Sequence, residues 1–415
     1  MNALSTSRRG FLLSSASLAG LAGLSAPAAA AQPAGDSSTA PATASTAIGK
    51  AARNVPLAPP DKQPEGLKIP EKPARQAGWA IVGLGQLALE EIMPAFAECQ
   101  TSKPVALVSG HPDKARKVAK AYGVSEDAIY DYQTYDRLAD NKEVDVIYIV
   151  LPNSMHAEFT IRGLKAGKHV LCEKPMATSA RDAEQMIAAA QAAKRHLMIA
   201  YRLHYEPFNM KAMEICKSGV LGKIKTFVST NGQNVEAPNI RLSGELGGGP
   251  MGDVGVYSIN AARYTLGEEP VEAYAVAQRP ADDPRFREVP ESVAYTLRYP
   301  SGAIAHCDCS FGMAESRFYQ VHGTEGSLKM DPAFSYRGLR LHVKEGDPKK
   351  GNAAAKELML PAKNHFAQEM DHFSSVILDG ETCRTPGEMG LADMRILEAL
   401  EASLKTGKPE PVVQA

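Results

Sequence analysis

The chain has 415 residues, 44% of them hydrophobic and 22% charged, so it holds enough apolar material for two cored domains and is not expected to be largely disordered. Its 46 Lys and Arg residues nearly balance its 47 Asp and Glu residues, which leaves no diffuse basic field to attract nucleic acid. The six cysteines are scattered and form no C-x-x-C pair, which argues against a disulfide scaffold. Cys307 and Cys309 alternate along a strand-like run and are predicted to be core residues.

Residues 1–31 are predicted to be a cleaved leader peptide. Arg8 and Arg9 precede an apolar run that is too short to span a bilayer, so no stable membrane anchor is expected, and Ala29 and Ala31 suit an A-x-A cleavage site. The paired arginines resemble a twin-arginine signal, which implies recognition by the twin-arginine export machinery and a periplasmic protein that folds around its cofactor before export. An ordinary Sec leader is the alternative.

Residues 32–77 are rich in Ala, Pro, Ser and Thr and are predicted to form an extended arm. A solvated linker and an arm laid across a neighbouring subunit both fit this composition. The apolar residues Leu57, Leu67 and Ile69 would anchor the arm in the second case.

From residue 78 short apolar strands alternate with amphipathic helices. The strands are predicted at residues 79–82, 105–108, 146–150, 169–171 and 197–200, and the helices at 88–98, 112–122, 156–166 and 180–194. This alternation predicts an α/β domain over residues 78–202, with a doubly wound parallel sheet of the Rossmann type.

Residues 203–415 have a different pattern. A helix after residue 207 is followed by alternating strands at 224–230, 271–279, 292–299, 303–311 and 317–321, and then by helices at 366–378 and 391–404. This order predicts an α+β domain with a large, open, mostly antiparallel sheet.

A G-x-G-x-x-A turn follows the first strand and opens a helix, which is the context in which this motif binds a dinucleotide. The first glycine permits a tight turn, the second lets the backbone approach a pyrophosphate, and the small last residue lets the helix pack on the strand. The candidate cofactor-binding residues are therefore Gly83, Leu84, Gly85, Gln86, Leu87 and Ala88.

The second strand ends at Ser109 and Gly110, where an NAD enzyme would usually place a carboxylate on the ribose hydroxyls. A 2'-phosphate would instead meet a hydroxyl, helix-start amides and the cations Lys114 and Arg116, so NADP is favoured over NAD. Asp113 is the one residue nearby that argues against this choice.

Two further strands end in polar residues, and the carboxyl ends of parallel strands face one ligand crevice. One end carries Asn153 and His156, and the other carries Glu173 and Lys174. Capping or surface roles are the alternative for each residue alone. In the second domain, Asp253 is predicted to be a helix N-cap that shares one helix face with Tyr257. The other possibility for Tyr257 is a half-buried core residue.

Taken together, these segments resemble the glucose-fructose oxidoreductase family within the larger Gfo/Idh/MocA group. The resemblance extends from the Pro-rich arm to the C-terminus, and residues 151–158 and 172–178 are its most specific segments. Tyr257 favours the glucose-fructose oxidoreductases within this group, because many other relatives carry a histidine at this position whereas glucose-fructose oxidoreductases carry a tyrosine.

The resemblance implies a periplasmic enzyme with tightly bound NADP that oxidises an aldose such as glucose to its lactone and then reduces a second sugar, such as fructose to sorbitol. It also implies a homotetramer or dimer built on the sheet of the second domain, with the arm over the adenine side of the cofactor. The further cofactor-binding candidates are Tyr132, Leu151, Pro152 and Arg202, and the substrate-binding candidates are Tyr201, Tyr205 and Asn260.

The hypothetical mechanism uses Tyr257 as the acid–base group, with the Lys174 ammonium stabilising its charged form and Asp253 orienting the sugar or Lys174. No H-E-x-x-H motif, cysteine pair or carboxylate cluster occurs, so no metal is expected.

Three alternatives to this interpretation of the function remain. The segment 235–242 departs from the longer loop of the family, so an aldose could replace fructose as acceptor. The chain could be an NADP-dependent aldose dehydrogenase that releases its cofactor, or a non-catalytic sensor of NADP and sugar.

Overall fold

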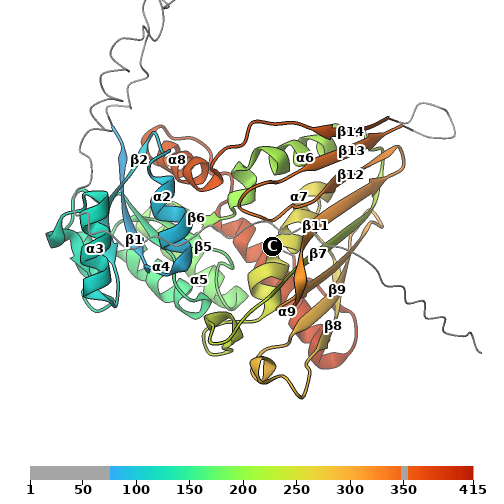
Figure 1. Ribbon diagram of the computed structural model, residues 1–415, viewed down its shortest axis with the longest axis horizontal. Helices are drawn as coiled ribbons and strands as arrows, with labels where there is room; N and C mark the ends of the chain where they lie inside the picture. Colours follow the sequence, from blue (N-terminus) through green and yellow to red (C-terminus); the bar gives the residue numbers. More distant parts are fainter. Residues whose placement is uncertain (1–74, 347–353, 415) are drawn as a thin grey trace, which may run out of the picture. The chain divides into compact units, whose positions relative to one another are not determined.

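The computed structural model describes residues 75–346 and 354–414, which belong to one compact unit (Figure 1). The predicted leader and all but the last three residues of the predicted arm lie outside the described residues. None of the described helices combines the length and the apolar character needed to cross a membrane.

The first domain contains a six-stranded parallel sheet with the strand order β3-β2-β1-β4-β5-β6. Its strands are β1 (Ala77–Val82), β2 (Ser102–Val108), β3 (Ile129–Tyr130), β4 (Val146–Ile149), β5 (His169–Glu173) and β6 (Leu197–Ala200). The helices α3 (Pro112–Tyr122), α4 (His156–Lys165) and α5 (Ala180–Ala193) connect them. The doubly wound order confirms the predicted fold class.

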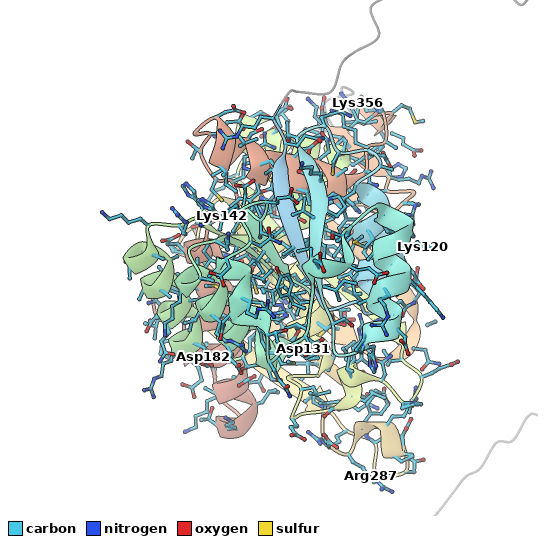
Figure 2. All side chains as sticks on the ribbon, turned by 90° about the vertical axis from the view of Figure 1, so that its left-hand side faces the viewer. Lys120, Asp131, Lys142, Asp182, Arg287 and Lys356 are labelled. Atoms are coloured by element: carbon cyan, nitrogen blue, oxygen red, sulfur yellow. The ribbon has the colours of Figure 1, made fainter. Side chains whose placement is uncertain are left out.

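The central strands are fully buried, which explains why they read as continuous apolar runs. Charged residues of the same domain, such as Lys120 on α3 and Lys142 before β4, lie at its exterior (Figure 2). The two-residue strand β3 was not predicted because it is too short to show a period.

The helix predicted at residues 88–98 is shorter and wider than expected. It includes a π-helical segment η2 (Ala88–Ile92), continues as α2 (Met93–Ala95) and ends before Glu98.

The second domain contains a nine-stranded sheet with the order β14-β13-β12-β11-β7-β10-β9-β8-β15. Its strands are β7 (Ile224–Asn234), β8 (Glu272–Gln278), β9 (Ser292–Arg298), β10 (Ile304–Ser310), β11 (Gly312–Gly323), β12 (Gly326–Met330), β13 (Leu341–Glu345), β14 (Ala354–Leu358) and β15 (Glu410–Pro411). Of the strand pairs in this sheet, β7 and β10 run parallel and the others antiparallel, which confirms the predicted sheet type.

Four helices complete the described part of the chain: α6 (Pro207–Ser218), α7 (Val256–Leu266), α8 (His365–Leu378) and α9 (Gly387–Thr406). Helices α6, α7 and α9 pack against the nine-stranded sheet, whereas α8 packs against β1 and β2 of the first domain (Figure 1). The Trp79 indole N–H donates to the Ser374 hydroxyl at 3.2 Å across this contact. Cys307 and Cys309 are buried, as predicted.

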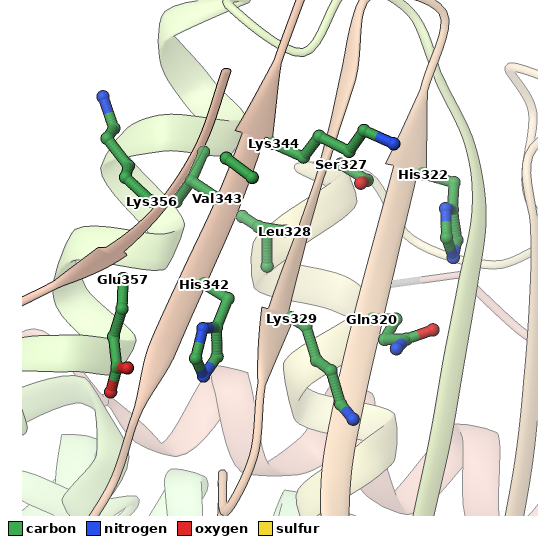
Figure 3. Close-up of a pocket in the computed structure, with 11 residues that line it drawn as sticks. Gln320, His322, Ser327, Leu328, Lys329, His342, Val343, Lys344, Lys356 and Glu357 are labelled. Atoms are coloured by element: carbon green, nitrogen blue, oxygen red, sulfur yellow. The ribbon is translucent and has the colours of Figure 1, made fainter. Parts of the chain in front are cut away.

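A shallow hollow of about 270 Å³ lies on strands β11 to β14 (Figure 3). Residues with polar side chains, such as Gln320, Lys329, His342 and Glu357, line it together with apolar ones, and it contains none of the predicted site residues.

Candidate active site

The turn after β1 has the shape that a dinucleotide requires. Gly83 has a φ of +94°, and a Cβ there would lie 2.2 Å from the Val150 carbonyl oxygen, so only glycine fits. A Cβ at Gly85 would meet nothing within 4 Å, which leaves the backbone open to a ligand. Beyond them, Leu84 and Ala88 are buried and Gln86 is exposed. The residues present therefore fit a nucleotide pyrophosphate at this turn.

The end of β2 faces the same turn. The Ser109 hydroxyl accepts a hydrogen bond from the His111 backbone N–H at 3.1 Å, and the Lys114 ammonium donates to the Leu84 carbonyl at 3.2 Å. A Cβ on Gly110 would lie 3.1 Å from the ring of Tyr132, so the tyrosine covers this end of the strand.

The charges near this strand end differ from the expectation in one respect. Arg116, proposed to meet a 2'-phosphate, pairs with the Asp113 carboxylate at 2.5 Å. Both side chains are exposed, so the pair is a surface contact that solvent screens.

Asn153 and His156, which follow β4, form hydrogen bonds to backbone carbonyls of other segments. The Asn153 amide donates to the Gly247 carbonyl at 2.8 Å. The ring nitrogens of His156 lie 2.8 Å from the Pro175 carbonyl and 2.9 Å from the Leu151 carbonyl, and the side chain has no exposed surface. Both ring nitrogens of His156 are thus engaged within the protein, and its contact with the cofactor stays a prediction.

Lys174 stands at the end of β5 and binds the second domain. Its ammonium donates to the backbone carbonyl of Asp253 at 2.7 Å and to the carboxylate of the same residue at 3.1 Å. Arg241 binds the other carboxylate oxygen through Nε at 2.6 Å. Asp253 thus joins two cations, one from each domain.

The prediction that Asp253 is a helix N-cap is wrong. It lies within the π-helical segment η8 (Met251–Gly255), which runs directly into α7, so no helix begins at Asp253 and its carboxylate is free to bind Lys174 and Arg241. The glycines before it allow this placement, since a Cβ on Gly248 would lie 2.4 Å from the Arg241 carbonyl oxygen.

Tyr257 lies between cations from the first domain. The Lys174 ammonium is 4.6 Å from the centroid of its ring, and the Arg202 guanidinium is 5.0 Å from it. Arg202 also donates through Nε to the Tyr257 hydroxyl at 3.2 Å and stacks at 4.6 Å from the centroid of the Tyr336 ring. The half-buried Tyr257 and the 38% exposed Tyr336 leave this cluster open to a ligand.

The charged states of the cluster follow from these contacts. Burial disfavours the charge on Lys174, but the neighbouring Tyr257 and Asp253 outweigh it and raise the pKa of Lys174 to about 12. Burial alone would raise the pKa of the Asp253 carboxyl, but Lys174 and Arg241 hold it well below its usual range. The site therefore keeps a permanent ion pair beside the phenol.

Glu173, the residue before Lys174, is in an environment that disfavours its charged form. Burial raises the pKa of its carboxyl, although Lys174 partly opposes this shift, and one carboxyl oxygen accepts a hydrogen bond from the Tyr148 hydroxyl at 2.7 Å. It points into the domain interior rather than to the ligand side.

The three predicted substrate-binding residues are buried. Tyr201, Tyr205 and Asn260 are each at most 5% exposed. The Asn260 amide donates to the Asp393 carboxylate at 3.0 Å, and the Tyr205 hydroxyl bonds to Thr385 at 3.0 Å. These two contacts attach α9 and its preceding turn to the rest of the fold, and a contact of the three residues with a sugar stays a prediction.

Two residues of the cluster were missed from the sequence. Arg241 lies in the shortened loop, one position inside the short helix η7 (Ile240–Leu242), and Tyr336 lies between β12 and β13. Only the Asn239 cap before Arg241 is visible as a local signal, and the segment around Tyr336 shows none.

Comparison with known proteins identifies the family. Residues 77–201 match the oxidoreductase family model with an NAD-binding Rossmann fold, and residues 209–329 match the GFO/IDH/MocA C-terminal domain. A D-xylose 1-dehydrogenase (NADP(+)) of Haloarcula marismortui is 30% identical over 339 residues, which cover 79% of this chain and 91% of that relative. The chain belongs to the GFO/IDH/MocA oxidoreductase family.

Solved structures agree with this family assignment. An aldose-aldose oxidoreductase from Caulobacter crescentus, complexed with glycerol, is 42% identical, with a TM-score of 0.78, and the match covers 81% of this chain and all of that one. A 3-ketoreductase from Actinomadura kijaniata, in complex with NADP, is 26% identical, with a TM-score of 0.70 over 79% of this chain and 98% of that one. The predicted resemblance to the Gfo/Idh/MocA group is confirmed, and with it a nucleotide-binding oxidoreductase.

Proposed function

We propose that this member of the GFO/IDH/MocA family is a sugar oxidoreductase that keeps NADP bound and transfers hydride from an aldose to a second sugar. The observation that carries the proposal is the cluster of Lys174, Asp253 and Tyr257 at the carboxyl ends of the parallel strands, on the same sheet edge as the open glycine turn. The bound nicotinamide supplies the hydride acceptor and donor.

The protein residues manage the proton. As hydride leaves the anomeric carbon of the aldose, the Tyr257 oxygen takes the proton of the anomeric hydroxyl and a lactone forms. In the second step the same phenol returns the proton to the carbonyl oxygen of the acceptor sugar, which becomes an alcohol. Asp253 holds the Lys174 ammonium over the phenol ring, which fixes the position of both groups beside the sugar.

NADP is proposed over NAD on two grounds. The end of β2 carries Ser109 in place of a carboxylate that would repel a 2'-phosphate. In addition, two relatives named D-xylose 1-dehydrogenase are described with NADP(+). Tight retention of the cofactor is proposed from the predicted export of a folded protein, because a periplasmic enzyme would meet little free nucleotide.

Two acceptor sugars are proposed. The resemblance to glucose-fructose oxidoreductases supports reduction of fructose to sorbitol, whereas the similarity to the aldose-aldose oxidoreductase of Caulobacter crescentus supports an aldose as acceptor. A nucleotide-releasing aldose dehydrogenase is the second candidate, supported by the named xylose dehydrogenases.

We also propose that the protein is exported to the periplasm, loses its leader and self-associates through the nine-stranded sheet. Along β8, Ala273 and Ala275 are buried, whereas Tyr274 and Val276 are 38% and 51% exposed. Exposed apolar residues on an open sheet face are suited to contact a second copy of the chain.

The proposal is tested by product analysis. Purified protein is desalted, mixed with glucose and either fructose or a second aldose, and given no nucleotide. Formation of a lactone and an alcohol in equal amounts is the expected result. Turnover that begins only when NADP is added supports the dehydrogenase instead, and no turnover with any sugar pair and NADP overturns the proposal.

A further inference from the structure

Arg202 is a buried cation whose hydrogen bonds within the described residues all go to uncharged acceptors. It lies at the start of η6 (Arg202–Tyr205), directly after β6, and is 3% exposed. Its guanidinium donates to the Phe334 carbonyl at 2.6 Å, to the Ser335 carbonyl at 3.3 Å and to the Tyr257 hydroxyl at 3.2 Å. Among the described residues, no carboxylate forms an ion pair with it.

Two buried carboxyl groups lie near enough to act on Arg202 electrostatically, but neither balances its charge well. Burial raises the pKa of both Glu173 and Glu369, which favours their neutral forms. Glu369 has no exposed surface, and neither of its carboxyl oxygens has a hydrogen-bond partner among the described residues. The positive charge of Arg202 is therefore incompletely compensated while Tyr257 is neutral.

The charge of Lys174, unlike that of Arg202, is balanced by a carboxylate. Its hydrogen bonds go to Asp253, whose carboxylate balances the ammonium, and it approaches Tyr257 over the ring face at 4.6 Å. Arg202 instead reaches the hydroxyl oxygen itself, where the charge of a phenolate is largest. Of the two cations, Arg202 is the one placed to hold that charge.

We propose that Arg202 is the positioning residue that stabilises the phenolate of Tyr257, with that phenolate as the missing counter-ion of the buried guanidinium. The inference rests on the proposed function. In donor oxidation the phenolate takes the anomeric hydroxyl proton while hydride passes to the oxidised nicotinamide, and in acceptor reduction the phenol gives that proton to the carbonyl oxygen as hydride returns. Arg202 stays protonated in both steps, so it acts on the sugar only through Tyr257.

Several other groups also face Tyr257, and the test has to separate Arg202 from them. The charged or titratable groups around the phenol or bonded to its neighbours are Tyr148, Glu173, Lys174, Arg241, Asp253 and Tyr336.

The first readout is independent of the cofactor. The tyrosinate absorbance of the wild type minus that of Tyr257→Phe reports the ionisation of Tyr257 as the pH is raised. The same difference is taken between Arg202→Met and the double variant Arg202→Met, Tyr257→Phe. Without Arg202, the ionisation of Tyr257 is expected to move by about one to two pH units to higher pH. Arg340→Met removes an exposed arginine paired with Glu357 and serves as the control without a shift.

The second readout is the rate at which an aldose reduces the bound nicotinamide in a single turnover. We expect Arg202→Met to slow this step by about 10- to 100-fold, the effect of losing a charged hydrogen bond, and to add nothing when Tyr257 is already phenylalanine. Equal slowing in both backgrounds with an unmoved tyrosinate titration would mean that Arg202 only anchors the segment at residues 334–335, and would overturn the inference.

A variant that fails to fold does not end the test. Arg202→Lys keeps the charge and can still bind one carbonyl, and circular dichroism shows whether it folds. A shift of the tyrosinate titration well below the one to two pH units expected for Arg202→Met supports the inference, because the charge is retained. A shift of that full size in a folded Arg202→Lys contradicts it. If no aldose reduces the nicotinamide of the wild type while the titration still depends on Arg202, the proposed function fails and the contact to Tyr257 stands.

Discussion

The Lys174 ammonium donates to both the backbone carbonyl and the carboxylate of Asp253, and these two bonds connect the end of β5 to the segment before α7. Lys174 belongs to the nucleotide-binding domain and Asp253 to the sheet domain. The charged pair beside Tyr257 therefore forms only when both domains are folded against each other, which makes the site sensitive to changes on either side.

Replacing Tyr257 by phenylalanine removes the proton-transferring hydroxyl and keeps the ring that packs against Arg202 and Lys174. We expect turnover to fall by about 100-fold or more, the usual contribution of general acid–base catalysis, with the nucleotide still bound. Steady-state rates and the nucleotide content of the desalted protein measure the two effects. A variant with full turnover would remove Tyr257 from the mechanism.

Asp253→Asn leaves Lys174 with a neutral partner in a buried site. Breaking a buried pair of this kind costs about 3 kcal/mol, measured as the loss in free energy of unfolding. The depressed pKa of Asp253 contributes stability above its ordinary value of 3.8, and the raised pKa of Lys174 does so below 10.5. The difference between wild type and variant should therefore be constant between these limits and shrink below pH 3.8. A difference that grows on acidification would contradict the assignment.

Two glycines of the turn after β1 should respond differently to substitution. Gly83→Ala forces a side chain into a positive φ and against the Val150 carbonyl, so we expect a loss of about 1 to 3 kcal/mol in stability. Gly85→Val meets open space, so the variant should lose its nucleotide and melt near the nucleotide-free wild type, below the nucleotide-loaded protein. Unchanged nucleotide content in Gly85→Val would show that the cofactor does not approach this turn.

Glu369→Gln tests the buried carboxyl on α8. A raised pKa means that the folded protein holds a proton which the unfolded chain releases above pH 4.5, so the wild type loses stability as the pH rises. Glutamine has no such proton, and its advantage in melting temperature over the wild type should grow from pH 5 to pH 8. The exposed Glu357 provides the control in Glu357→Gln. An advantage for Glu369→Gln that is independent of pH would place a charged carboxylate at this position in the folded state.

Val276→Asp probes the proposed contact between copies of the chain. The side chain is 51% exposed, so a charge there should leave the folded monomer intact. Light scattering after size exclusion should show a smaller assembly for this variant than for the wild type. Lys344→Glu, which also changes an exposed side chain of the sheet, reports on the β12 to β14 side. Identical masses for all three proteins would exclude the sheet face around β8 as the contact.

The central elements of the fold were predictable because their burial is uniform. Strands such as β1 and β4 are buried throughout, and the alternation in β9 and β10 gives a clear period of two. Strands β12, β13 and β14 were not predicted. They are five residues long, so β12 and β13 each show only two alternating apolar residues, which is too few to establish a period. The side chains of β14 are mostly exposed and include Lys356 and Glu357, so its sequence lacks an apolar period.

The candidate site was predictable only in part. Lys174 was predicted because it follows the carboxyl end of a parallel strand, and Asp253 and Tyr257 because they share a helix face and match the family. The structure brings the three residues together. The substrate-binding roles of Tyr201, Tyr205 and Asn260 stay predictions. Their deep burial and the bond from Asn260 to Asp393 depend on the tertiary structure, which the sequence pattern does not show. Arg241 and Tyr336 reach the site from distant loops, so no local pattern marks them.

The most direct test of the account follows the nicotinamide itself. Desalted protein, with no nucleotide added, is mixed first with an aldose and then with a second sugar while the near-ultraviolet absorbance is recorded. We predict that the absorbance of the reduced nicotinamide appears with the first sugar, at no more than one equivalent per chain, and disappears with the second. Protein that carries no nucleotide, or whose bound nucleotide stays oxidised in the presence of every aldose, would contradict the account.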